Sequence, residues 1–393
     1  MNKPWSAPTD ALLPCQRALF DMPREVCFLN AASWSPLPLV SQEAGRIGAA
    51  RKGQPWKLGP EFAPAPHQRA RVAAARLLNA DPEDVALISS VSYGVATAAK
   101  LFSVPAGARV LVLEDDHSSP VLEWMTRAPQ QGFAVEVVRR PADGDWTDAV
   151  LAAIERRGGP PLALVSISSV HWSDGGLVDL DAVAPAARAH GAALLVDATH
   201  SAGVLALDVR ALDPDFLVFP TYKWVLGPYG RAFLYIAKRH QDGVPLEQTS
   251  YGRRAVAAER VPYFSDTGYV TGARRFDMGE RDHFISLEMA AIGMELMGRW
   301  GSAAVVGRLS MLTDRLAAGL AGCGVHIAPA RVRAPHVLSL AFPNGMPERL
   351  FDNLAAENIY VASRLGHLRI SPHVYNDEAD IDRFIAVFRD IMR

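Results

Sequence analysis

An acidic and a basic side chain stand 26 residues apart in the segment 196–236, each directly after an apolar run. Asp197 ends the run ALLV, and Lys223 follows the run FLVF between Tyr222 and Trp224. Lysine is seldom buried without a task, because an ammonium is costly to remove from water. A lysine amine in a confined site can form a Schiff base with an aldehyde, whereas a surface lysine only carries charge. Asp197 could instead cap a helix, and no second acid at ligand spacing supports a metal site.

Two further candidates also follow strand-like runs. Ser92, Tyr93 and Gly94 come after VALISS at the expected start of a helix, where backbone N–H groups and the helix dipole favour a phosphate. A plain helix cap is the alternative for this serine. A serine-nucleophile elbow is disfavoured, because Ser90 stands where G-x-S-x-G requires glycine. His117 follows RVLVLEDD, so all these positions lie where ligands of parallel α/β proteins collect, beyond the carboxyl ends of the strands.

These residues together predict a pyridoxal phosphate site. The helix N-terminus would hold the phosphate, Lys223 the aldehyde, and Asp197 the protonated pyridine nitrogen, while a flat side chain covers the ring. Asp197 and Lys223 would thus bind opposite ends of the pyridoxal phosphate ring.

The surrounding pattern predicts an α/β fold with a mostly parallel seven-stranded sheet. Most of the apolar runs are continuous rather than alternating, as in strands buried on both faces, and helical stretches separate many of them. The predicted strands are 85–90, 109–114, 133–138, 162–168, 193–197, 216–219 and 231–236.

The pattern changes after about Gly268, which predicts a smaller α+β domain. Helices are expected over 285–300 and 305–320, and the Pro-rich stretch 54–66 is expected to be an irregular loop. The predicted division is a large cofactor-binding domain of residues 28–267 and a small domain of residues 1–27 and 268–393.

The bulk composition excludes several classes of partner. Formal net charge is −2 with both signs interspersed, which gives no nucleic-acid signal. No apolar stretch is long enough for a membrane span, and the N-terminus lacks the basic-then-apolar layout of a signal peptide. Cys15, Cys27 and Cys323 are isolated, so we expect no disulfide framework, no metal site and a reducing cytoplasmic location.

Several stretches resemble the class V aminotransferases, a family of fold-type-I pyridoxal phosphate enzymes that includes cysteine desulfurases and isopenicillin N epimerase-like enzymes. The resemblance spans about residues 28–382. Its motifs are FLNAASWSPLP, SSVSYGVATAA, SISSVHWSDGGLVDL, DATHSAGVLALDV, DFLVFPTYKWVLGPYGRAFLY, GARRFDMGE and LRISPHVYNDEADID.

The resemblance implies roles for individual residues. Lys223 is implied as the Schiff-base lysine and proton shuttle, Asp197 as the partner of the pyridine nitrogen, and His200 as a neighbour of the phenolic oxygen. Arg369 is implied to take the substrate carboxylate, and Arg275 to serve this site or that of a neighbouring subunit, since a homodimer with its site at the subunit interface is also implied. The remaining cofactor contacts implied are Ser92, Tyr93 and Gly94 with Tyr222 at the phosphate, His117 on the ring face and His171 at the ring edge.

The family fixes the cofactor better than the reaction. We expect an enzyme acting on an α-amino acid by transamination or β-elimination; the alternatives are an amino-acid epimerase of the isopenicillin N epimerase type and a non-catalytic pyridoxal phosphate-binding protein. Cysteine desulfurases carry a nucleophilic Cys in a loop before the carboxylate-binding Arg, and the matching stretch here, VASRLGHLRIS, has none.

Overall fold

The computed structural model describes residues 12–59, 64–257, 259 and 261–393. The first eleven residues of the predicted small domain therefore lie outside the described residues. The predicted division at residue 268 remains a prediction.

A seven-stranded sheet forms the centre of the molecule, in the order β2-β8-β7-β6-β5-β3-β4. Strand β8 alone runs opposite to the other six strands, so the predicted, mostly parallel sheet is confirmed. The strands lie within two residues of their predicted bounds: β2 (Val85–Ile88), β3 (Arg109–Leu113), β4 (Ala134–Val138), β5 (Leu162–Ser168), β6 (Ala193–Asp197), β7 (Phe216–Pro220) and β8 (Ala232–Ile236).

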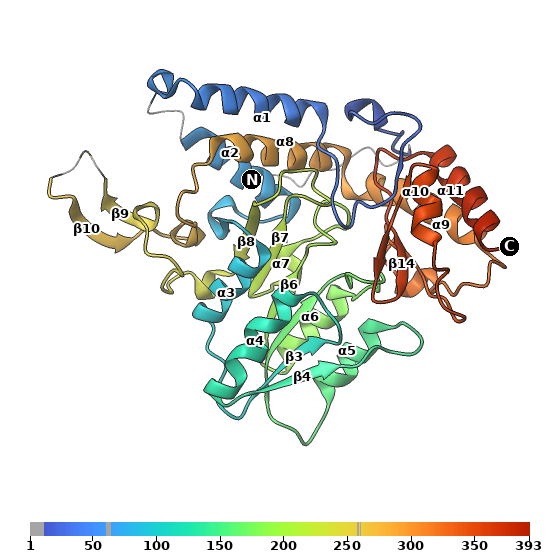
Figure 1. Ribbon diagram of the computed structural model, residues 1–393. Helices are drawn as coiled ribbons and strands as arrows, with labels where there is room; N and C mark the ends of the chain where they lie inside the picture. The colour runs from blue at the N-terminus through green and yellow to red at the C-terminus, as the bar shows by residue number, and fades with distance from the viewer. Residues whose placement is uncertain (1–11, 60–63, 258, 260) are drawn as a thin grey trace.

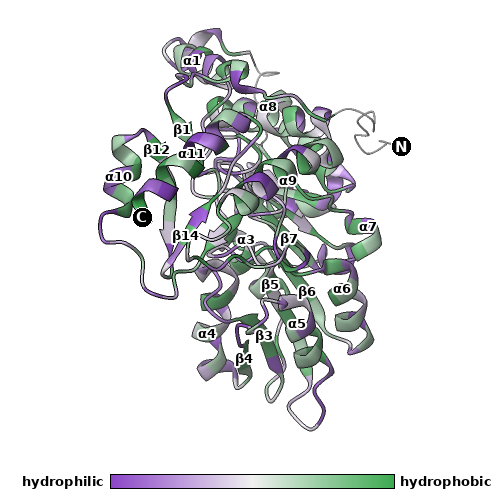
Figure 2. Ribbon diagram, turned by 90° about the vertical axis from the view of Figure 1, so that its right-hand side faces the viewer, coloured by the Kyte–Doolittle hydropathy of each residue, from purple (hydrophilic) through white to green (hydrophobic). Residues whose placement is uncertain are grey.

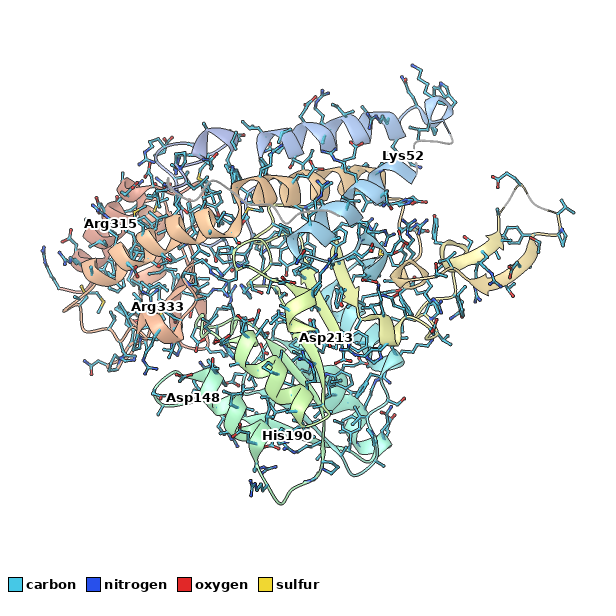
Figure 3. The ribbon with its side chains drawn as sticks, turned by 180° about the vertical axis from the view of Figure 1, so that it is seen from behind. Lys52, Asp148, His190, Asp213, Arg315 and Arg333 are labelled. Atoms are coloured by element: carbon cyan, nitrogen blue, oxygen red, sulfur yellow. The ribbon has the colours of Figure 1, made fainter. Side chains whose placement is uncertain are left out.

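Helices cover both faces of this sheet because its strands are apolar on both faces. Val110 and Val112 pack with α3 (Val91–Leu101) and α4 (Ser118–Gln131), whereas Leu111 and Leu113 face the other side. Figure 3 shows that other side, with Asp148, His190 and Asp213 marking its helices. The helices there are α2 (Pro64–Leu77), α5 (Trp146–Glu155), α6 (Leu180–Ala189), α7 (Val209–Leu212) and α8 (Phe284–Trp300).

A second, smaller core joins the two ends of the chain. Its sheet has the order β11 (Leu338–Leu340), β14 (His367–Ile370), β13 (Ala362–Arg364), and β1 (Cys27–Phe28) pairs in parallel with β12 (Ile359–Tyr360). Figure 1 shows the dark blue N-terminal segment beside this red C-terminal part. The helices of this part are α9 (Ser302–Gly319), α10 (Leu350–Ala356) and α11 (Glu378–Ile391).

The packing of α8 and the position of one hairpin complete the fold. Helix α8 packs against α2 and α1 (Leu39–Lys52), although it follows the predicted boundary and they precede it. A hairpin of β9 (Arg253–Val256) and β10 (Phe264–Tyr269) projects from the body of the molecule (Figure 1). No helix in the described ranges combines the length and the apolar run that a membrane crossing needs.

The predicted irregular loop over residues 54–66 includes residues 60–63, which lie outside the described residues, and the prediction was wrong at its end. Helix α2 begins at Pro64, inside that stretch. Proline fits the first turn of a helix, because the N–H it lacks there has no partner within the helix.

A buried ion pair fastens the edge of the sheet to the segment after the hairpin. Arg71 of α2 contacts Asp277 at 2.7 Å with both side chains fully buried, and Arg71 also donates to the carbonyl of Val85. The other oxygen of Asp277 accepts from the backbone N–H of Leu87 at 2.9 Å. The pair therefore satisfies polar groups of three elements that no water reaches.

Replacing Arg71 with Ala should lower the free energy of unfolding by about 3–5 kcal/mol, because it leaves a buried carboxylate short of partners. The loss should be at the lower end of this range, because Arg281 also pairs with Asp277 and would remain in the variant. Urea unfolding of the variant measures this. The matched control is Arg315→Ala, which breaks the exposed Arg315–Asp382 pair and should cost about 0–1 kcal/mol. Equal losses in both variants would contradict the account.

Candidate active site

A cavity of about 140 Å³ lies at the carboxyl edge of the central sheet. Strands β2, β3, β5, β6 and β7 all end there, and the segments that follow them supply most of its wall. The lining residues are Ser89, Ser90, Val91, Ser92, His117, Ser119, Ser168, Trp172, Asp197, Thr199, His200, Pro220, Tyr222, Lys223, Tyr229, Gly230 and Arg231.

Lys223 reaches into this cavity from the turn after β7. The side chain is almost buried, and its Nζ lies 3.2 Å from Nε2 of His200 and 5.5 Å from the ring centre of Tyr222. Burial, followed by the positive charge of Arg369, lowers the pKa of Lys223 to about 7, and Asp197 opposes this shift. At neutral pH the Lys223 amine is thus uncharged in a large fraction of the protein molecules. A nucleophilic amine must be in this uncharged form.

Asp197 ends β6 and is buried. Its Oδ1 accepts from the backbone N–H of Thr199 at 2.9 Å and from the Thr199 hydroxyl. Burial raises the pKa of the Asp197 carboxyl, whereas these hydrogen bonds and the charges of His117 and Lys223 lower it. A cationic partner in the cavity would therefore stabilise the ionised form of the Asp197 carboxyl. Thr199 was not predicted as a site residue.

His200 faces Lys223 with one ring nitrogen and Trp224 with the other. The indole Nε1 of Trp224 donates to Nδ1 of His200 at 3.0 Å. Because an indole N–H only donates, Nδ1 must accept and carries no proton. Burial and the neighbouring Lys223 hold the pKa of His200 well below its ordinary value, so the ring is neutral. Its single proton is then on Nε2, directed at Lys223.

Two more buried histidines fix this arrangement from the C-terminal part of the chain. His336 Nε2 lies 2.6 Å from the carbonyl oxygen of His200, and His373 Nε2 lies 3.1 Å from that of Trp224. Both rings also pack on the Trp224 indole, at centroid distances of 4.4 and 5.4 Å. Neither histidine was predicted as a site residue, and no role was predicted for Trp224.

The helix that follows β2 begins one residue earlier than the phosphate prediction assumed. Helix α3 starts at Val91, and Ser90 is its N-cap, with its hydroxyl accepting from the N–H of Tyr93 at 3.1 Å. Ser92 lines the cavity, with its Oγ 3.0 Å from that of Ser119, whereas Tyr93 and Gly94 do not line it. A Cβ on Gly94 would lie 2.8 Å from the Val218 side chain, so this glycine permits close packing of helix on sheet.

Arg231 stands at the same end of the cavity and was not predicted as a site residue. Its Nε donates to Ser286 Oγ at 2.7 Å, the side chain is buried, and no ion pair of Arg231 occurs within the described residues. Burial lowers the pKa of Arg231, as expected of a cation without an anion beside it. The α3 N-terminus and this guanidinium together fit a phosphate.

The structure separates the two histidines predicted at the ring. His117 caps α4, lines the cavity and meets Trp172 edge-on with a centroid distance of 5.8 Å. His171 is buried behind the wall, stacked on Trp146 at 5.0 Å, and is not a lining residue. Trp172, its neighbour, lines the cavity instead. Tyr222 also lines the cavity, and burial raises its pKa to about 12.

The two predicted arginines lie in different places. Arg369 of β14 is buried, and donates to Ser33 Oγ at 2.8 Å and to the carbonyl of Trp172, which places it beside the cavity. Arg275 donates to the carbonyl of Val270 at 3.0 Å and lies 5.6 Å from the ring centre of Tyr269, at the base of the hairpin. Arg275 does not line the cavity of its own chain.

The polar groups of the cavity fit a flat heterocycle that bears an aldehyde, a ring nitrogen and a phosphate. An anion site, a buried amine with a lowered pKa and a buried carboxyl all line this one cavity. The fit of pyridoxal phosphate thus follows from the donors and acceptors of the cavity, with Arg231 added to those predicted.

Comparisons with known proteins show the family and the fold to which the chain is similar. A family model described as aminotransferase class-V matches residues 60–384. An uncharacterized aminotransferase of Bacillus subtilis, YcbU, is 27% identical over 331 residues, which cover 84% of each chain. An isopenicillin N epimerase of Streptomyces clavuligerus is 26% identical over 369 residues, covering 90% of this chain and 92% of the other. A solved structure of a C-DES variant, with glycine covalently linked to its PLP cofactor, has a TM-score of 0.82 at 21% identity, over 95% of this chain and 99% of that one.

Trp224→Phe tests the tautomer of His200. The variant keeps an aromatic ring but removes the donor to Nδ1, a hydrogen bond worth about 1 kcal/mol or roughly a fivefold change in tautomer ratio. In cofactor-free protein labelled with ¹⁵N-histidine, the His200 signals should change from one Nε2–H tautomer to a mixture. Trp124→Phe is the matched control, because Trp124 is equally buried and donates to Ser166 Oγ at 2.9 Å. A wild-type Nε2–H pattern that persists in Trp224→Phe would refute the assignment.

Proposed function

The chain belongs to the aminotransferase class-V family, and we propose that it binds pyridoxal phosphate covalently through Nζ of Lys223 and acts on an α-amino acid by transamination or β-elimination. The family itself establishes a pyridoxal phosphate-dependent enzyme of the transferase or lyase kind. The observation that carries the specific proposal is the meeting of Lys223, Asp197 and the Arg231 anion site in one cavity.

Pyridoxal phosphate, when bound, supplies an electron sink for charge that develops at the substrate Cα. Asp197 would hold a proton on the ring nitrogen, and its raised pKa favours such a cationic partner. His200 would donate from Nε2 to the phenolic oxygen, which is the role its tautomer permits. Arg231, Ser92 and the α3 N-terminus would bind the phosphate, with His117 beside the ring.

The substrate would lie on the side of the cavity nearest Arg369. A guanidinium offers two parallel N–H donors that match a carboxylate, so Arg369 would orient the α-carboxylate. Lys223 would then move a proton at Cα, since its pKa of about 7 lets it both take and return one near neutral pH. Trp172, whose carbonyl accepts from Arg369, would exclude water from this side, and Tyr222 would contact the phosphate.

Epimerisation is the second candidate, and the Streptomyces clavuligerus relative favours it because the alignment covers nine-tenths of both chains. The two candidate functions differ in the product that the enzyme releases. Transamination or elimination yields a keto acid, whereas epimerisation returns the amino acid with its Cα inverted, so chiral chromatography of the products separates them.

A persulfide mechanism is not proposed. Desulfuration of that kind needs a thiolate near the substrate. All three cysteines lie within the described ranges, and none of them lines the cavity. Cys27 is buried beside the carbonyl of Asp380, and burial raises the pKa of its thiol to about 12.

Lys223 should carry the cofactor. After reconstitution with pyridoxal phosphate and borohydride reduction, peptide mapping should find the label on the peptide containing Lys223. Lys223→Ala should still bind pyridoxal phosphate reversibly, and turnover should fall at least about 1,000-fold with the loss of the acid–base group. Lys238→Ala, an exposed lysine after β8, is the control and should keep wild-type labelling. A label on any other lysine would end the proposal.

We also propose a cytoplasmic homodimer with the site at its interface. Trp34 and Tyr229 are 59% and 63% exposed and stack at 5.0 Å beside the cavity, and Phe264 on the projecting hairpin is 67% exposed. Such aromatic surface is typical of an interface. Light scattering at micromolar concentration should give about twice the 42.5 kDa chain mass. A monomer mass under these conditions would contradict the dimer.

A further inference from the structure

The C-terminal sheet turns a basic face toward the cavity. Strands β13 and β14 are joined by a two-residue turn, with Arg364 paired to His367 and Ala362 paired to Arg369. Paired residues share a face, so Arg364, His367 and Arg369 lie on the same side of this hairpin. The alternate residues Leu368 and Ile370 pack into the small core. Figure 2 shows hydrophilic colour on the ribbon of β14.

Two guanidinium groups meet on one hydroxyl at this face. Nη2 of Arg364 and Nη2 of Arg369 each donate to Ser33 Oγ at 2.8 Å. Neither arginine forms an ion pair with any acid among the described residues, and Nε of Arg369 is buried without a hydrogen-bond partner. Like charges placed diagonally on a hairpin are unfavourable.

The positive charges of Arg364 and Arg369 affect the pKa of Arg369 and the pKa of the Lys223 amine. Burial, and then the charge of Arg364, lowers the pKa of Arg369 to about 9. Both guanidiniums also lower the pKa of Lys223. This end of the site therefore holds an excess of positive charge that no side chain of the described protein neutralises. One α-carboxylate neutralises only one of the two arginines.

We propose that Arg364 binds a second acidic group, on the side chain of the substrate, so that the enzyme selects short acidic α-amino acids such as aspartate or glutamate over their amides. The proposal rests on the proposed function, because Arg369 must hold the α-carboxylate. Since both Nη2 atoms contact the same oxygen, they lie close together, and only a short side chain brings its acid that near to the α-carboxylate. Arg364 is half-buried, so its guanidinium is not sealed from a ligand, and its charge acts on the Lys223 amine of the cavity.

The test compares aspartate with asparagine, which differ in charge and hardly in shape. The holoenzyme is titrated with each amino acid, and the change in its visible absorbance gives a dissociation constant whatever reaction follows. Glutamate with glutamine forms the second pair, and alanine reports α-carboxylate binding alone. Wild-type protein should bind aspartate or glutamate at least about 10-fold more tightly than the matching amide.

Arg364→Gln should weaken binding of the acidic member by about 10- to 100-fold and change asparagine and alanine by less than about 3-fold. Arg364→Lys should restore part of the loss, because an ammonium keeps the charge without the planar fork. The matched control Arg315→Gln removes an arginine from α9 on the outer surface and should leave all constants unchanged (Figure 3).

Equal weakening of aspartate, asparagine and alanine in Arg364→Gln would overturn the proposal, since it would mean that both arginines grip the α-carboxylate. A wild-type protein without preference for the acidic member would overturn it too, while leaving the proposed function intact. A protein that takes up pyridoxal phosphate but responds to no amino acid would overturn both.

Discussion

Removal of the Lys223 amine from water is the constraint on which the rest of the structure depends. An ammonium in that position would lack a full counter-charge, because Arg369 and Arg364 lie near it as well as Asp197. A pKa of about 7 in place of the ordinary 10.5 corresponds to a cost on the order of 4 kcal/mol to the fold at neutral pH. Such a cost is borne where a function needs the neutral amine, and the surrounding groups all act on that amine or on what it would bind.

Three separate parts of the chain have to pack together for this environment to exist. The central sheet supplies Lys223 and Asp197 at the ends of neighbouring strands, at a spacing that the register of β6 and β7 fixes. The C-terminal segment supplies Arg369, His336 and His373, and the N-terminal segment supplies Ser33. Because His200 and Trp224 are held by the carbonyl contacts of those histidines, the protonation of the site depends on the packing of the small core against the large one.

The continuous apolar runs of the sequence predicted the strands of the central sheet and the residues that directly follow them. The seven strands are confirmed within two residues, and the positions of Lys223 and Asp197 after two of them led to one shared site. Arg231 was not predicted because it precedes a strand rather than following one, whereas β8 runs antiparallel and brings its amino end to the same edge. The sequence did carry a signal for this. A strand that follows β7 and runs parallel to it would need a crossover helix, and residues 221–231 contain none, so β8 had to run antiparallel.

Other residues could not be found from the chain alone. The direction of the Trp224 indole, the stacking of His171 on Trp146 and the meeting of Arg364 with Arg369 on Ser33 depend on tertiary packing between segments up to 336 residues apart. Ser90 and Ser92 are two residues apart and both polar, so sequence pattern alone did not distinguish the cap from the lining residue.

The most direct test of the account is the titration of Lys223 in cofactor-free protein. Competitive labelling with trace acetic anhydride, read by mass spectrometry on the peptide containing Lys223, gives the fraction of neutral amine at each pH. Because burial lowers the pKa, the label should rise as pH increases through about 7 and level off above it. In Arg369→Gln the midpoint should move upward, since a cation has been removed. A Lys223 midpoint near 10.5, or one indifferent to Arg369, would contradict the account.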